Sequence, residues 1–179
     1  MDNTYTINIA GLERKLPLCP INEHLDIAAF VMFSDVEITV ASAKALLEKC
    51  PDFDVIITAE SKGIPLAYEM ARQSGKPYVV ARKSVKLYMK NPISVTVKSI
   101  TTAAEQILHL SADKTEMLKD KKVLIVDDVI STGESLKAIE QIVIAAGGNI
   151  VGKAAVLAEG DAADKDDLIF LEKLPVFPK

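Results

Sequence analysis

The stretch VLIVDDVISTGES, residues 123–135, joins an apolar strand to two adjacent acids and then to a hydroxyl-rich turn that opens a helix. Lys122–Asp127 is predicted as a buried strand because its apolar side chains follow one another without a break. Glu134–Ala146 carries apolar residues at helical spacing, and Gly147 with Gly148 ends it, as glycines commonly end helices. A strand, a turn and a helix in this order are typical of one unit of a parallel sheet covered by helices.

The same alternation continues on both sides of this stretch. Asp54–Ala59 and Tyr78–Arg82 are predicted as strands, with a helix at Ile64–Gln73 between them. Asn149–Leu157 is predicted as the next strand, and Leu168–Pro178 contains a last short one. We therefore expect an α/β fold with a central, mostly parallel sheet flanked by helices.

Two regions break this alternation. A proline-flanked lead precedes an amphipathic helix near Val36–Lys49, and we expect this region to cap the sheet. Lys83–Thr102 contains several lysines among Ser, Thr, Asn and Pro, with alternation at Ser94–Lys98. This pattern predicts an exposed, flexible loop or hairpin, and such loops often carry function.

Composition limits the class of protein and its partners. With 179 residues, 49% of them hydrophobic, the chain can bury one sizeable core, and we expect a single domain over residues 1–179. The net charge of −4 gives no broad positive field, so neither nucleic acid nor a membrane surface is an expected partner. Cys19 and Cys50 form no disulfide framework, and residues 1–12 lack the apolar core of a signal peptide, which favours the cytoplasm.

The turn at residues 131–135 has the chemistry of a phosphate site. A helix start presents unpaired backbone N–H groups and the positive end of the helix dipole, which contributes roughly 0.3–1 kcal/mol toward an anion. Gly133 lets the backbone close around that anion, and the hydroxyls of Ser131, Thr132 and Ser135 can donate further hydrogen bonds. In the alternative interpretation, Ser131 or Thr132 simply caps the helix.

Asp127 and Asp128 are expected at the carboxyl end of the strand, where open α/β sheets bind their ligands. Ionised carboxylates accept hydrogen bonds from neighbouring sugar hydroxyls. The segment therefore offers acceptors for a sugar and donors for its phosphate, although a solvated acidic turn would show the same residues.

VLIVDDVISTGES resembles the signature of the type I phosphoribosyltransferases, which bind phosphoribosyl diphosphate. The resemblance implies that the two acids hold the ribose hydroxyls and that the turn, including Glu134, holds the 5-phosphate. Adenine enzymes tend to have glycine where this chain has Glu134. It also implies the fold of that family, with a small N-terminal hood over about residues 1–35 and a flexible loop over about residues 83–104.

Thr58–Pro65, TAESKGIP, is a second turn between a strand and a helix, and it accepts an anion by the same dipole argument. Ser61, Lys62 and Gly63 resemble the loop that binds diphosphate in the family, which implies a catalytic role for the Lys62 charge. An ordinary turn with a solvated lysine is the alternative.

Arg82 and Lys86 place positive charge at the end of the next predicted strand. A guanidinium can bind diphosphate through two parallel hydrogen bonds. Similar sequences stand here in adenine and xanthine phosphoribosyltransferases, which implies that Arg82 is a catalytic ligand of diphosphate and Lys86 a further contact. A solvated basic cluster is the alternative.

Phe33 resembles the phenylalanine that stacks on the purine in adenine phosphoribosyltransferases, and Val129 would form the other wall of that pocket. An aromatic residue beside an amphipathic helix also fits a core position. Ser34 departs from the arginine that is usual in that family. Lys98–Ala104, KSITTAA, lacks the Leu-Glu-Tyr-Gly stretch of the adenine enzymes and is closer to xanthine enzymes and purine-operon repressors.

The resemblance implies an enzyme of purine salvage that makes a nucleoside 5-monophosphate and diphosphate from phosphoribosyl diphosphate and a purine base, with adenine favoured. It implies Mg²⁺ carried by the diphosphate without direct protein ligands, and a homodimer. Xanthine, guanine or hypoxanthine as the base, and a regulator that binds the donor without turnover, are the alternatives.

Other chemistries have less support in the sequence. It contains no G-x-x-x-x-G-K-[ST] loop and no G-x-G-x-x-G turn, so another nucleotide-using α/β enzyme is the weaker alternative. His24 and His109 lack metal-ligand spacing, and there is no G-x-S-x-G turn, so zinc and hydrolytic chemistry are not expected.

Overall fold

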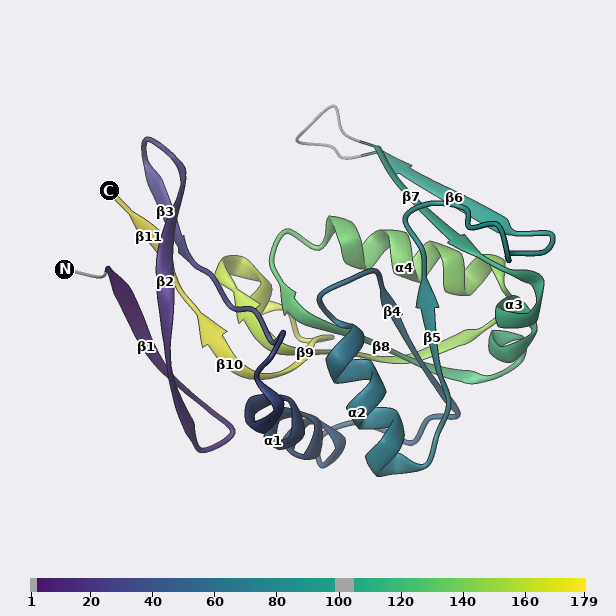
Figure 1. Ribbon diagram of the computed structural model, residues 1–179, viewed down its shortest axis with the longest axis horizontal. Coiled ribbons are helices and arrows are strands. Elements are labelled where there is room, and N and C mark those ends of the chain that lie inside the picture. Colours follow the sequence, from purple (N-terminus) through teal and green to yellow (C-terminus); the bar gives the residue numbers. More distant parts are fainter. Residues whose placement is uncertain (1–2, 99–104) are drawn as a thin grey trace.

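The computed structural model describes residues 3–98 and 105–179, and at its centre lies a five-stranded parallel sheet (Figure 1). Residues 99–104, part of the predicted flexible loop and of the KSITTAA segment, lie outside the described residues. The strand order is β10-β9-β8-β4-β5. The prediction of an α/β fold with a parallel central sheet is confirmed. Its strands are β4 (Val55–Ala59), β5 (Tyr78–Ala81), β8 (Lys122–Ile130), β9 (Asn149–Glu159) and β10 (Ile169–Leu174).

Helices cover both faces of this sheet, as the alternation of side chains along β8 shows. Leu124 and Val126 pack in one core cluster with α1 (Val36–Leu47) and α2 (Ile64–Ser74). Val123 and Ile125 pack in the other cluster with α4 (Glu134–Ala145). Because successive side chains of a strand point to opposite faces, α4 lies on the face opposite to α1 and α2.

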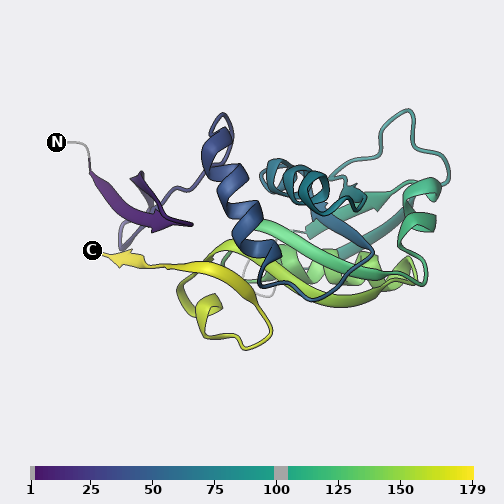
Figure 2. The same cartoon turned by 90° about the horizontal axis from the view of Figure 1, so that it is seen from below.

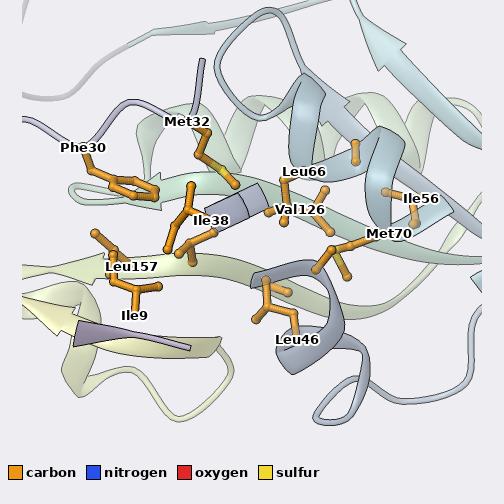
Figure 3. Packing of buried hydrophobic residues seen from close by; sticks show 14 of the residues in the cluster. Ile9, Phe30, Met32, Ile38, Leu46, Ile56, Leu66, Met70, Val126 and Leu157 are labelled. Carbon is orange, nitrogen blue, oxygen red and sulfur yellow. The ribbon is translucent and has the colours of Figure 1, made fainter. Parts of the chain in front are cut away.

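The first cluster joins the sheet to the N-terminal part of the chain (Figure 3). Met32, Ile38 and Val126 of the sheet belong to this cluster, while Leu46 of α1 and Met70 of α2 lie close together in it. These side chains are almost fully buried, and each contributes about 1.5–3 kcal/mol relative to an exposed position. This packing fixes α2, and with it the turn that precedes α2, on the sheet.

The opposite face carries an antiparallel hairpin and a short helix. The hairpin consists of β6 (Ile93–Lys98) and β7 (Glu105–Leu110), which pack on α4 (Figure 1). The helix α3 (Ala112–Leu118) follows β7. The extended pattern predicted at Ser94–Lys98 is therefore a strand, whereas β7 and α3 were not predicted.

A second, four-stranded antiparallel sheet lies at one end of the molecule, where both termini are found (Figures 1 and 2). It was not predicted as strands, because prolines inside β2 read as breakers and the β1–β2 turn, Ala10-Gly11, lacks the usual Asn-Gly signal. Both turn residues have positive φ, 51° and 83°. The strands are β1 (Thr4–Ile9), β2 (Leu12–Asn22), β3 (Leu25–Ala28) and β11 (Val176–Pro178).

The order of the central strands places a switch point between β4 and β8. The chain leaves β4 for β5 on one side and leaves β8 for β9 on the other. β8 pairs with β4 only as far as Ile125, but it pairs with β9 as far as Ile130. β8 therefore runs beyond its predicted end at Asp127. Strands β4 and β8 separate at this point, where open α/β sheets bind ligands.

Within the described ranges, no helix is long and apolar enough to cross a membrane.

Candidate active site

A cavity of about 440 Å³ lies over the switch point between β4 and β8. Its walls come from the turn after β4, from the end of β8 and the turn that follows, from the first turn of α4, and from β7. The residues that line it are Ala59, Glu60, Ser61, Lys62, Lys83, Gln106, Leu108, Asp127, Asp128, Val129, Ile130, Ser131, Thr132, Gly133, Ser135 and Leu136. Most of the residues predicted to bind sugar and phosphate are thus brought together.

The carboxylate pair forms the floor of this cavity. Asp128 is only 2% exposed, and its Oδ2 accepts no hydrogen bond within the described part of the chain. Lys62 Nζ lies 3.5 Å from that oxygen. Asp127 Oδ1 accepts a hydrogen bond of 2.9 Å from the backbone N–H of Asp128. A buried carboxylate oxygen with a cation nearby and no donor is suited to accept a hydroxyl of a ligand.

Burial and the neighbouring acid change the acidity of this pair. Burial, followed by the charge of Asp128, raises the pKa of Asp127 to about 7, while the charge of Lys62 acts in the opposite direction. The pair therefore holds part of a proton near neutral pH. A ligand that brings hydroxyl donors or a cation would favour the doubly ionised form.

The turn after β8 starts α4 without a side-chain cap. Gly133 is the N-cap residue, in the left-handed region at φ 83°, and as a glycine it supplies no side-chain cap. The alternative in which Ser131 or Thr132 caps the helix is thus not found. The start of α4 lies beside hydroxyl-bearing residues, and the positive end of its dipole points toward the cavity, as an anion site requires. Glu134 begins α4 and is not one of the cavity-lining residues.

The turn after β4 is held against the acids by a close backbone approach. A Cβ atom on Gly63 would lie 2.9 Å from Asp127 Oδ1 and 2.4 Å from Thr58 Oγ1, so only glycine fits. Gly63 is also the N-cap of α2, again with no side-chain cap. The peptide bond between Glu60 and Ser61 is cis. Two uncapped helix starts therefore approach the acid pair, one from each side of the switch point.

Arg82 is linked to the cavity through Glu60 and does not line it. Its Nη2 donates to Glu60 Oε1 at 3.1 Å, its Nη1 donates to the Tyr88 hydroxyl, and its buried Nε has no partner in the described residues. The backbone N–H of Lys83 donates to Glu60 Oε2 at 2.9 Å. The hydrogen bond from Arg82 holds the pKa of Glu60 below its usual value. Arg82 borders a neighbouring hollow of about 310 Å³.

Lys86 and Phe33 are also placed apart from the main cavity. Lys86 Nζ donates to Ser84 Oγ at 2.6 Å. Phe33 is 48% exposed and borders a hollow of about 320 Å³ between α1 and α2, with Val36 and Tyr68. Val129 lines the main cavity, so the two residues predicted to enclose a base do not line one cavity.

Sequence reasoning missed Glu60, Gln106 and Leu108 as cavity residues, and it placed Lys83 at this sheet edge only as positive charge, without a role in binding. Glu60 precedes the quoted Ser-Lys-Gly turn, and Lys83 follows Arg82, so proximity in sequence was available as a signal. Gln106 and Leu108 belong to β7, which was not predicted. For these two residues, the only signal in the sequence was the alternation of polar and apolar side chains in EQILHL, which is typical of a strand.

The acids fit a hard divalent ion that is carried on a ligand. Within residues 3–98 and 105–179, no three His, Cys, Asp or Glu side chains form a group that could hold a metal. The carboxylate oxygens of Asp127 and Asp128 are nevertheless of the kind that Mg²⁺ accepts, and Asp128 Oδ2 has no hydrogen-bond donor among the described residues. Such an ion would need most of its ligands from phosphate oxygens and water.

Comparisons with known proteins agree with this geometry. Residues 36–174 match the model of the family described as "Phosphoribosyl transferase domain". An adenine phosphoribosyltransferase of Petrotoga mobilis is 39% identical over 102 residues, which are 56% of this chain and 56% of that protein. This chain therefore matches just over half the length of that relative. A hypoxanthine/guanine phosphoribosyltransferase of Methanothermococcus okinawensis is 32% identical over 162 residues, covering 86% of this chain and 85% of that protein.

The fold itself is found among solved structures. The crystal structure of an adenine phosphoribosyltransferase from Thermoanaerobacter pseudethanolicus superposes with a TM-score of 0.73 at 21% identity. The match covers 88% of this chain and 95% of that one.

Proposed function

This chain belongs to the phosphoribosyl transferase domain family, and we propose that it transfers a phosphoribosyl unit from phosphoribosyl diphosphate to a purine base. The products are a nucleoside 5-monophosphate and diphosphate, as in purine salvage. The observation that carries this proposal is the buried pair Asp127 and Asp128, which shares one cavity with the uncapped start of α4. Adenine is the favoured base because a relative and a structural neighbour carry that name.

The two acids and the α4 turn bind opposite ends of the ribose 5-phosphate. Asp127 and Asp128 accept hydrogen bonds from the ribose hydroxyls. The backbone N–H groups of residues 131–135 and the hydroxyls of Ser131, Thr132 and Ser135 bind the 5-phosphate. The distance between strand end and helix start thus sets the position of the sugar.

The turn before α2 binds the diphosphate. Ser61, Lys62 and the N–H groups that follow Gly63 face the acids across the cavity, and Arg82, Lys83 and Lys86 add positive charge at the adjacent strand end. As the bond between the anomeric carbon and diphosphate breaks, a purine nitrogen forms the new bond from the opposite side and loses its proton. Catalysis comes from positioning the reactants and from stabilising the leaving diphosphate.

Mg²⁺ carried on the donor would supply positive charge that offsets the charge of the diphosphate. Asp127 and Asp128 are the residues of this chain that would approach it. The negative charge of the two carboxylates would also stabilise the positive character that develops on the sugar, which favours the transition state over the bound donor.

Val129 forms one wall of the base site, and Phe33, which borders a neighbouring hollow, is the candidate to stack on the base. The segment that follows Arg82, of which the structure describes residues 83–98, covers the cavity and excludes water, which protects the donor from hydrolysis. The sheet built from β1–β3 and β11 acts as the hood, within a single domain over residues 1–179.

Oligomeric state and compartment are part of the same proposal. Val85, Leu87 and Tyr88 are exposed apolar side chains beside Arg82, which supports a homodimer through this segment. Two free cysteines and an acidic chain support a cytoplasmic protein without nucleic-acid partners. A mass measurement in solution that finds only monomer would reject the dimer.

The deciding experiment measures diphosphate release from phosphoribosyl diphosphate and Mg²⁺ with adenine, hypoxanthine, guanine or xanthine in turn. We expect the fastest release with adenine and a nucleotide product of matching mass. A double variant, Asp127→Asn with Asp128→Asn, is the inactive control.

A regulator that binds the donor without turnover is the second candidate, because KSITTAA at residues 98–104 lacks the Leu-Glu-Tyr-Gly stretch of the adenine enzymes. Donor binding without release for any base would support it.

A further inference from the structure

Strand β7 has one buried face and one exposed face. Leu108 and Leu110 are 3% and 1% exposed and belong to the core cluster that contains Ala138 and Ile139 of α4. Ile107, which lies between Gln106 and Leu108 in the strand, is 39% exposed. Because side chains alternate along a strand, Gln106 lies on the same face as Leu108 and Leu110.

The buried face of β7 continues beyond the core into the cavity. Gln106 and Leu108 line the cavity together with Gly133, Ser135 and Leu136. Leu108 and Leu136 also share one core cluster, so this part of β7 stands beside the first turn of α4. Gln106 is thus a polar residue on the inward face of β7, and its side chain borders the cavity.

The amide of Gln106 is not used by the protein itself. Among the described residues no side-chain hydrogen bond of Gln106 is found, although its cross-strand partner Val97 packs against the core. An inward-facing position in this pattern is normally apolar, as Leu108 and Leu110 are. A glutamine there without a partner indicates that its amide has a partner in the ligand.

We propose that Gln106 is a substrate-binding residue that donates its amide N–H to the 5-phosphate, and so completes from the hairpin the site formed by residues 131–135. The inference rests on the proposed function and names a further residue for it. The 5-phosphate is the group concerned because Gln106 stands on the α4 side of the cavity, whereas Ser61 and Lys62 come from the turn after β4. The hairpin thereby responds directly to the presence of the sugar phosphate.

The test measures dissociation constants by calorimetry for ribose 5-phosphate, for phosphoribosyl diphosphate with Mg²⁺, and for inorganic diphosphate. Gln106→Met keeps the shape but loses the donor, and it should weaken binding of both sugar phosphates by roughly tenfold while inorganic diphosphate binds unchanged. Gln106→Glu should weaken them more, because it adds a repelling charge. Gln106→Lys restores a donor and should recover wild-type affinity or better.

The matched control is Thr96→Val, which removes a polar group from the exposed face of β6, opposite Ile107. Unchanged affinity for ribose 5-phosphate in both Gln106→Met and Gln106→Glu would overturn the inference. Equal losses for all three ligands would also overturn it, since they would indicate a general structural effect. If the unsubstituted protein bound none of the ligands, the proposed function itself would fail.

Discussion

The Lys62 ammonium group lies 3.5 Å from Oδ2 of Asp128, across the gap that opens between the turn after β4 and the end of β8. The lysine side chain is 53% exposed, whereas the Asp128 side chain is 3% exposed. The cation can therefore move toward a diphosphate, but the carboxylate stays fixed. The Lys62 side chain can adjust to the bound ligand, and the Asp128 carboxylate fixes the position of that ligand.

Replacing Asp128 by Asn should weaken binding of phosphoribosyl diphosphate with Mg²⁺ by roughly ten- to hundredfold. Hydrogen bonds to charged groups contribute about 1.5–3 kcal/mol, and about 1.4 kcal/mol corresponds to tenfold in affinity. Calorimetric titration measures the change. Asp166→Asn, at an exposed position, is the matched control and should bind as the wild type does. Wild-type affinity in Asp128→Asn would remove the acid pair from the proposed site.

Thr132→Val should weaken ribose 5-phosphate binding by about fivefold, because one neutral hydroxyl donor contributes about 1 kcal/mol. Thr132 is exposed at the cavity, so the fold should be retained. Thr6→Val, on the exposed face of β1, is the control for loss of a hydroxyl. The assignment of the turn to phosphate fails if both variants bind equally well.

Arg82→Met should lower the affinity for inorganic diphosphate by roughly tenfold, since a charge-assisted bond to the guanidinium is lost. Arg72→Met is the matched control, because Arg72 is also paired with a glutamate, Glu69, but lies on α2 outside the cavity. If Arg82→Met alters thermal stability and leaves diphosphate binding unchanged, Arg82 serves only to position Glu60.

The pH dependence of the free energy of unfolding should show that the pKa of Asp127 is raised in the folded protein. The pKa of Asp127 is raised to about 7, above its value in the unfolded chain, so the folded state holds a proton that the unfolded chain has lost above about pH 4. The stability that the protonated Asp127 side chain gives the folded state is fully present below pH 4 and is lost as the pH rises toward 7. Asp127→Asn removes this titrating group, and with it the dependence of stability on pH in this range.

Urea denaturation at pH 5, 6, 7 and 8 checks this sign. The stability of Asp127→Asn relative to wild type should increase from pH 5 to pH 8, by an amount on the order of a few kcal/mol. Lys62 remains in both proteins and reduces the effect. A difference that is constant with pH would show that Asp127 is ionised throughout.

Gly63→Ala should disturb the turn before α2. Its new methyl group would lie 2.4 Å from Thr58 Oγ1 and 3.2 Å from the Asp127 Cα, so the backbone must shift. Overpacking of this kind costs about 1–3 kcal/mol and should reduce diphosphate binding as well. Gly75→Ala is the control. At φ 68° it is strained, but it has open space and lies outside the cavity, so it should lower stability without loss of binding.

The elements that sequence predicted best are those where local pattern and tertiary role agree. The apolar run before Asp127 predicted the start of β8 at Lys122, although the strand continues to Ile130, and the helical spacing after Gly133 predicted α4 to within one residue. The Gly-Lys-Pro turn after α2 also separated helix from strand correctly. Residues of the two helix-start turns were found for the same reason, since their chemistry lies within a few positions of each strand.

The parts that were missed depend on contacts between distant segments. β2 contains Pro17 and Pro20, and it is a strand because β1 and β3 pair with its two edges. Gln106 becomes a cavity residue only because β7 packs on α4. Likewise, nothing local to Phe33 or Arg82 shows that they border hollows other than the main cavity.

Strand β11 closes the small sheet by pairing with β3, and Phe177 meets the ring of Tyr5 edge-on at 5.2 Å. These contacts join segments that are almost the whole chain apart, whereas β8, α4 and β9 join close neighbours. Long-range closure carries the larger entropic cost and forms late in folding. We therefore expect the small sheet to be the last part to acquire protection from hydrogen exchange during refolding, and the first part to lose it when Phe177 is replaced by Ala.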